Sequence, residues 1–109
     1  MHVIEVRNGE MMETLAKEAA RLGIRNGAIA SLIGAVDSFT ISTMRETDAT
    51  EDIVSSYDVP AEMTGTGEIV DGSIHVHAVM AVEGDRCLGG HLHSATIGAF
   101  FARAYVIIA

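Results

Sequence analysis

The sequence predicts an α+β fold in which one principal helix packs on one face of a mainly antiparallel sheet. One segment, residues 10–22, has apolar residues at helical spacing, and most of the remaining chain alternates apolar and polar residues with a period of two. The 109 residues, 49% hydrophobic and 20% charged, suffice for a single packed domain over residues 1–109. A domain this small buries only about two-thirds of the surface that its unfolded chain exposes, so we also expect a homo-oligomer.

The helix is predicted from the spacing of its apolar and charged residues. A short predicted strand, residues 2–7, ends at the Asn8-Gly9 turn just before it. Within residues 10–22 the apolar positions recur at intervals of three and four, at Met12, Leu15, Ala16, Ala19 and Leu22. Gly23 follows, a residue that commonly ends helices, so the helix is predicted to stop there.

The rest of the chain is predicted to form strands at residues 28–36, 39–45, 53–59, 62–70, 73–82, 86–93 and 97–108. Asp71-Gly72 lies between two alternating segments and favours a type I′ hairpin, and the three residues 83–85 mark a second hairpin. The short acidic cluster is interpreted as a solvated loop, and its members are Glu46, Asp48, Glu51 and Asp52.

Four of the five histidines lie within 19 residues, as the pairs His75/His77 and His91/His93. Each pair has a spacing of two, which places both members on one face of a strand. A three-residue turn at 83–85 would pair Val82 with Arg86, and His77 would then lie opposite His91 and His75 opposite His93. All four histidines are therefore predicted to share one face of the sheet, opposite the apolar face that the helix covers.

The neighbouring strand adds polar groups to the histidine face. Extending the register through the two-residue turn pairs Glu68 with His75 and Thr66 with His77, so a carboxylate and a hydroxyl lie beside the imidazoles. Either group could orient a ligating ring. Gly89 has no side chain to fill this face and would leave room for a metal or ligand.

Three histidines with an open fourth position are typical of a catalytic zinc site. We predict zinc, or another divalent transition metal, at His75, His77 and His91, with His93 as a fourth ligand, a supporting group or a bystander. The alternative is that these pairs are surface decoration or hydrogen-bonded interface pairs. If the protein is an enzyme, which the sequence leaves open, Glu68 is the candidate catalytic acid or base, although a solvated strand carboxylate is the simpler interpretation.

The charge balance argues against one class of partner. Fifteen acidic and seven basic residues give a formal charge of −8, the wrong sign for a protein that neutralises nucleic acid phosphates. Cys87 is the only cysteine, so it has no partner for an internal disulfide. It is interpreted as a buried structural thiol, with a metal ligand or a nucleophile as the alternative. No apolar segment approaches the roughly 20 residues of a membrane span, and no signal-peptide pattern is present, so we expect a cytoplasmic protein.

The C-terminal half resembles the plants-and-prokaryotes-conserved domain family, called PPC or PCC. The resemblance lies in a strand carrying His75-Val-His77 followed by the Gly89-Gly-His-Leu92 element, and it extends upstream to residues 22–27 and 31–36. It implies an α+β domain, a homotrimer as in prokaryotic members, and a superfamily relationship to acetolactate decarboxylase. The zinc-binding histidines of that enzyme correspond here to His75, His77 and His91.

The resemblance also implies an alternative function. Plant members of the family join this domain to AT-hooks that bind the minor groove of DNA, and prokaryotic members are often called DNA-binding by association. The chain has no Arg-Gly-Arg-Pro element, and Lys17 is its only lysine. We therefore expect a zinc protein that binds or transforms a small molecule, with a non-catalytic, DNA-associated regulatory or protein-interaction module as the alternative.

Overall fold

The computed structural model describes residues 1–109 as one nine-stranded antiparallel sheet and one helix. The helix is α1 (Met11–Arg21), and the strands are β1 (His2–Val6), β2 (Gly9–Glu10), β3 (Gly27–Val36), β4 (Ser38–Arg45), β5 (Asp48–Tyr57), β6 (Ala61–Val70), β7 (Ser73–Val82), β8 (Arg86–Ile97) and β9 (Ala102–Ile108). The α+β fold predicted from the sequence is confirmed.

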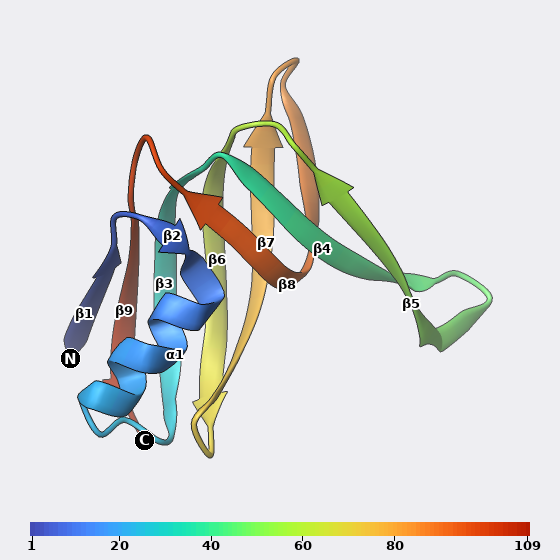
Figure 1. Cartoon of the computed structure of the whole chain (residues 1–109). Coiled ribbons are helices and arrows are strands. Elements are labelled where there is room, and N and C mark those ends of the chain that lie inside the picture. The colour runs from blue at the N-terminus through green and yellow to red at the C-terminus, as the bar shows by residue number, and fades with distance from the viewer.

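The sheet has the order β1-β9-β3-β6-β7-β8-β4-β5, and the short strand β2 pairs with β8. Figure 1 shows α1 on one face of this sheet, with β8 crossing obliquely on the same side and the β4–β5 hairpin extending away from the rest. The core of 24 buried apolar residues lies between the helix and the sheet. The opposite face of the sheet has no covering layer. No helix in the structure is long and apolar enough to cross a membrane.

The helix is fixed at both ends by hydrogen bonds that its sequence supplies. At the start, the Glu10 carboxylate accepts the backbone N–H groups of Met12 and Glu13, and also that of Ala95 on β8. At the end, Gly23 has a positive φ of 72°, and the backbone N–H of Ile24 donates to the Ala19 carbonyl at 2.9 Å, which is the Schellman arrangement. The predicted helix is confirmed, with residues 10 and 22 as its caps.

Both predicted hairpins are present. Asp71 and Gly72 each have a positive φ, as a type I′ turn requires, and they join Val70 to Ser73. The second hairpin joins paired residues Val82 and Arg86. These two turns fix which side chains of β6, β7 and β8 share a face.

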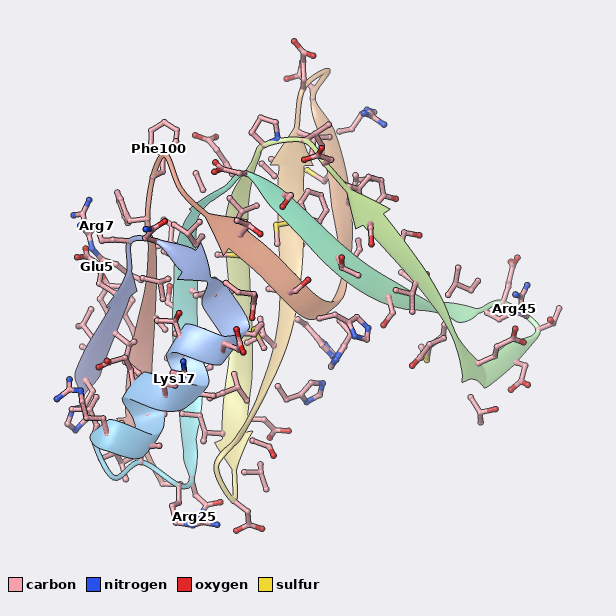
Figure 2. All side chains as sticks on the ribbon, in the orientation of Figure 1. Glu5, Arg7, Lys17, Arg25, Arg45 and Phe100 are labelled. Atoms are coloured by element: carbon pink, nitrogen blue, oxygen red, sulfur yellow. The ribbon has the colours of Figure 1, made fainter.

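Two predicted strand boundaries are wrong. The predicted strand at residues 97–108 is interrupted by a turn at 98–101, so its first residue ends β8 and the remainder forms β9. The turn was missed because its residues continue an almost unbroken apolar segment. Phe100 of this turn is exposed at the tip of the loop in Figure 2. The acidic cluster predicted to be a loop mostly belongs to strand β5, because the pairing of β5 with β4 continues as far as Asp48. Both faces of this end of the hairpin are exposed to water.

Candidate metal centre

The histidine face is built by the three neighbouring strands β6, β7 and β8. His77 pairs with His91, Glu68 with His75 and Thr66 with His77, which confirms these parts of the predicted register. The other face of β7 is buried from residue 76 to residue 82, at Val76, Ala78, Met80 and Val82. The alternation of the strand therefore holds His75 and His77 on the face opposite the core.

Three imidazoles meet on this face. One nitrogen from each of His75, His77 and His91 can be chosen so that all three lie within 4.8 Å of one another. The ring centroids of His75 and His91 are 4.9 Å apart, and those of His75 and His77 are 4.8 Å apart. His75 and His77 are exposed and His91 is partly buried, so the cluster opens to solvent.

Glu68 contacts the cluster from strand β6. Its Oε2 atom lies 3.3 Å from Nδ1 of His75, and the two side chains are 57% and 46% exposed. In the neutral histidine, an Nδ1–H that donates to the carboxylate leaves Nε2 as a free acceptor. Glu68 thus favours the tautomer in which Nε2 of His75 can bind a metal.

His93 lies beside His91, with ring centroids 4.8 Å apart, but is not one of the three histidines whose nitrogens converge. The pairing of β7 with β8 ends at His77 and His91, so the predicted pairing of His75 with His93 is wrong. Beyond this point β8 leaves β7 and pairs with β4, where a bulge inserts His93 between two paired positions. His93 Nε2 instead lies 2.8 Å from the hydroxyl oxygen of Ser42. Ser42, which is only 5% exposed, carried no signal in the sequence.

The protonation of His91 reflects its surroundings. Partial burial lowers the pKa of His91 from its ordinary value of 6.5, and the neighbouring His93, His75 and His77 lower it further, whereas Asp52 opposes the shift. Burial disfavours the charged imidazolium, and nearby positive charge does the same. His91 is therefore neutral at pH 7, the form in which imidazole binds metals.

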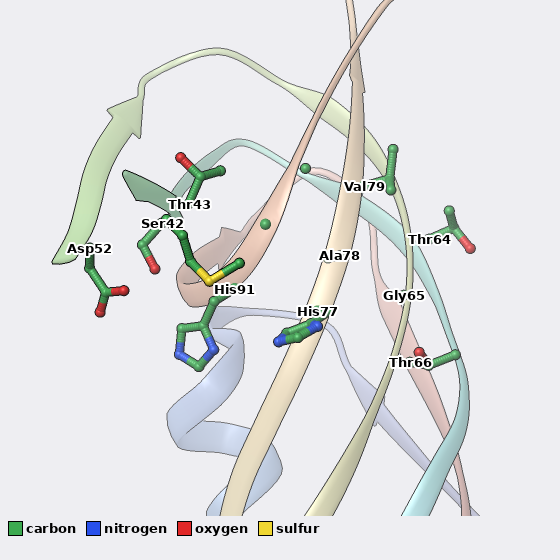
Figure 3. Close-up of a pocket in the computed structure, with 13 residues that line it drawn as sticks. Ser42, Thr43, Asp52, Thr64, Gly65, Thr66, His77, Ala78, Val79 and His91 are labelled. Carbon is green, nitrogen blue, oxygen red and sulfur yellow. The ribbon is translucent and has the colours of Figure 1, made fainter. Parts of the chain in front are cut away.

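A cavity of about 820 Å³ adjoins the histidines. His77 and His91 line it together with residues of β6 and of the β4–β5 hairpin, among them Thr64, Thr66 and Asp52. Figure 3 shows the Asp52 carboxylate reaching from β5 toward the side of the cavity that holds the His91 ring. Gly89 also lines the cavity, so the space predicted from this glycine is present.

A second cavity of about 220 Å³ is lined by Glu68, His75 and His77, with Thr66 and Gly67.

The other candidate residues, Cys87 and His2, lie away from the histidine cluster. The prediction of a buried thiol is wrong, because Cys87 is exposed where it pairs with Ala81 near the β7–β8 turn, outside both cavities. His2 pairs with Val106 at the opposite edge of the sheet.

The donor set fits a transition metal. Zinc–imidazole bonds of about 2.0–2.1 Å place tetrahedral ligand nitrogens about 3.3 Å apart. Nitrogens already within 4.8 Å can approach that spacing by side-chain rotation, because His75 and His77 are exposed and His91 is only partly buried. Three neutral imidazoles leave the remaining coordination position for water or a ligand.

The sequence matches the family model described as the Plants and Prokaryotes Conserved (PCC) domain over residues 1–109. The chain belongs to this family. No curated protein matches it in sequence. The resemblance found in the histidine and glycine motifs is thus confirmed over the whole chain.

Solved structures share the PCC fold. A plant- and prokaryote-conserved protein from Pyrococcus horikoshii aligns with a TM-score of 0.80 and 18% identity, over 99% of this chain and 78% of that one. A metal-containing protein from Archaeoglobus fulgidus aligns with a TM-score of 0.77 and 23% identity, over 99% and 79%. A protein from Ralstonia eutropha JMP134, whose name proposes DNA binding, aligns with a TM-score of 0.78 and 22% identity, over 98% of this chain and 76% of that one.

A larger enzyme contains a region with a similar fold. The α-acetolactate decarboxylase of Bacillus subtilis aligns with a TM-score of 0.57 and 16% identity, over 99% of this chain but only 52% of the enzyme. At this identity the similarity concerns the fold alone.

Proposed function

We propose that this PCC domain is a single-domain, homotrimeric, cytoplasmic protein that holds a zinc ion at His75, His77 and His91 and binds a small molecule at the open coordination position. The convergence of three imidazole nitrogens within 4.8 Å carries this proposal. The name of the Archaeoglobus fulgidus neighbour, a metal-containing protein, supports it. Bound zinc would polarise a carbonyl oxygen or lower the pKa of a bound water.

The chain's own residues supply the rest of the site. Glu68 would orient the ring of His75 through Nδ1, as carboxylates do for many metal-bound histidines. It also lines the smaller cavity, so it stays our candidate acid or base for a substrate bound on that side. His93 is assigned a supporting role through its contact with Ser42 rather than a ligand role.

Self-association is supported by the uncovered face of the sheet. Outward-facing apolar side chains on β1, β3, β7 and β9 are about half exposed, at Val3, Ile33, Val79 and Ile107. Exposed apolar faces of this kind mark interaction surfaces. We expect three copies per particle, measured as molar mass by light scattering, and a monomeric mass in dilute buffer would contradict the trimer.

Cobalt substitution tests the metal site. Co²⁺ added to metal-free protein should give the visible absorption of a four-coordinate ion at one equivalent per chain, and the His77→Ala variant should lose it. The matched control is His2→Ala, which removes an imidazole at the opposite edge of the sheet and should keep the band. If both variants bind alike, the assignment of the three ligands is wrong.

The second candidate function is a DNA-associated regulatory or protein-interaction module, which the name of the Ralstonia eutropha neighbour favours. The net charge of −8 opposes it. DNA binding that weakens with rising salt at physiological ionic strength would support this candidate. If the assembled protein shows no detectable binding to duplex DNA, the DNA-associated function is excluded.

A further inference from the structure

The charged groups around the larger cavity restrict what can bind there. Thirteen residues line it, and Asp52 is the only carboxylate among them, while none is lysine or arginine. A site for a carboxylate or phosphate normally provides a guanidinium, an ammonium or a helix N-terminus. The residues that line this cavity provide none of these. Apart from a bound metal, the only charged group of the cavity at neutral pH is therefore the negative carboxylate of Asp52.

Asp52 is not neutralised by its neighbours. The nearest arginine in sequence, Arg45, lies at the outer end of the β4–β5 hairpin in Figure 2, and its guanidinium forms an ion pair with Glu51 at 2.9 Å. Asp52 takes part in none of the five ion pairs of the molecule and in none of its side-chain hydrogen bonds. Asp52 therefore lines the cavity beside His77 and His91 with no counter-charge of its own.

The other lining groups suit an uncharged oxygen-bearing molecule. Thr64 and Thr66 offer hydroxyl groups from β6, and Met44 and Val79 offer apolar surface from β4 and β7. Hydroxyls can donate to or accept from alcohols and carbonyls, and the apolar side chains can cover a short carbon skeleton. The cavity's volume of about 820 Å³ accommodates a molecule of this kind.

We propose that the metal site binds small neutral hydroxy-carbonyl compounds or polyols and that Asp52 discriminates against anions of the same shape. This inference rests on the proposed zinc site and specifies its ligand class. The ligand's oxygen would take the open coordination position, and its remaining groups would face the threonines. An anionic analogue would face the unpaired carboxylate of Asp52 in the same cavity.

A matched pair of probes tests this discrimination. Lactamide and lactate share a hydroxyl and a carbonyl oxygen and differ only in carrying an amide or a carboxylate. Their dissociation constants would be measured from changes in the visible spectrum of the cobalt-loaded full chain. For Asp52→Asn we expect lactate to bind about three- to tenfold more tightly, as removal of one charge at partly screened range predicts, and lactamide to change less than about twofold.

Glu51→Gln is the control because it changes the net charge equally at the adjacent residue, which does not line the cavity. It should leave both affinities within about twofold. The inference is overturned if Asp52→Asn leaves lactate binding unchanged, if Glu51→Gln reproduces its effect, or if neither probe binds any cobalt-loaded variant. Failure of the parent protein to bind cobalt would instead overturn the proposed metal site.

Discussion

The Glu68 carboxylate lies 3.3 Å from Nδ1 of His75, across the pairing between β6 and β7. The contact occupies one ring nitrogen and leaves the other free to bind a metal. Both side chains are near half exposed, so the contact adds little to stability by itself. Its consequence is the orientation of one imidazole within the cluster.

Replacement of this carboxylate should weaken metal binding. We expect Glu68→Ala to lower zinc affinity by about 10- to 100-fold, because His75 loses the group that fixes its tautomer and orientation. The measurement is competition with a chromophoric chelator. Glu62→Ala is the control, since Glu62 lies on the same face of β6 but pairs with Ala81. Equal affinities for the two variants would contradict an orienting role for Glu68.

The capping carboxylate of Glu10 should matter more to stability than other acidic residues of the helix. Glu10→Ala removes the acceptor for three backbone N–H groups, so we expect the free energy of unfolding in urea to fall by about 1–2 kcal/mol. Glu13→Ala, which removes only a charge from the first turn, should cost at most about 1 kcal/mol. A larger loss for Glu13 than for Glu10 would contradict the capping assignment.

The interface between α1 and the sheet should dominate the stability of the metal-free protein. Leu15 is 1% exposed in the core, and Leu15→Ala should lower the free energy of unfolding by about 2–5 kcal/mol. Val54→Ala, on the exposed β5 edge, should change it by less than about 0.5 kcal/mol. Urea denaturation in the presence of a chelator would measure both, and similar losses would show that the helix does not cover the main core.

Glu5 should titrate at unusually low pH. Hydrogen bonds from the Arg103 guanidinium, and then from that of Arg7, hold the pKa of Glu5 below its ordinary value of 4.5. Because the folded state has the lower pKa, the stabilisation is present above about pH 4.5 and is lost as the pH falls through the lowered value. Figure 2 shows Glu5 and Arg7 side by side near the end of β1.

Carboxyl chemical shifts across a pH titration would measure this pKa. Arg103→Gln should raise it toward the ordinary value, since Arg103 contributes the largest lowering, and Arg7→Gln should raise it less. The assignment fails if Arg103→Gln leaves the titration of Glu5 unchanged.

The parts of the site that the sequence could predict depend on local chemistry. Asp71-Gly72 specifies a two-residue turn and residues 83–85 a three-residue turn, so the positions of Glu68, His75, His77 and His91 follow by counting along paired strands. The spacing of apolar residues similarly identified Leu15 and Ala19 on the buried face of α1, although it missed the buried Met11. In each case the determining residues are close in sequence.

The parts that could not be predicted depend on pairing between distant segments. β8 pairs with β7 only as far as His91, and its bulged pairing with β4 brings His93 to Ser42. Asp52 reaches the cavity because β4 and β5 extend their pairing through an exposed hairpin. The residues next to His93 and Asp52 in the sequence do not indicate where either side chain lies. The side-chain pattern of exposed strands is also too weak to separate them from loops.

Metal content per chain, measured by mass spectrometry on untagged protein, tests the three-histidine site most directly. The parent should contain close to one equivalent of zinc or another divalent transition metal, and the His75→Ala/His77→Ala variant should contain almost none while remaining folded by circular dichroism. A parent that carries no metal even after zinc is supplied, or a double variant that retains a full equivalent, would contradict the proposed site.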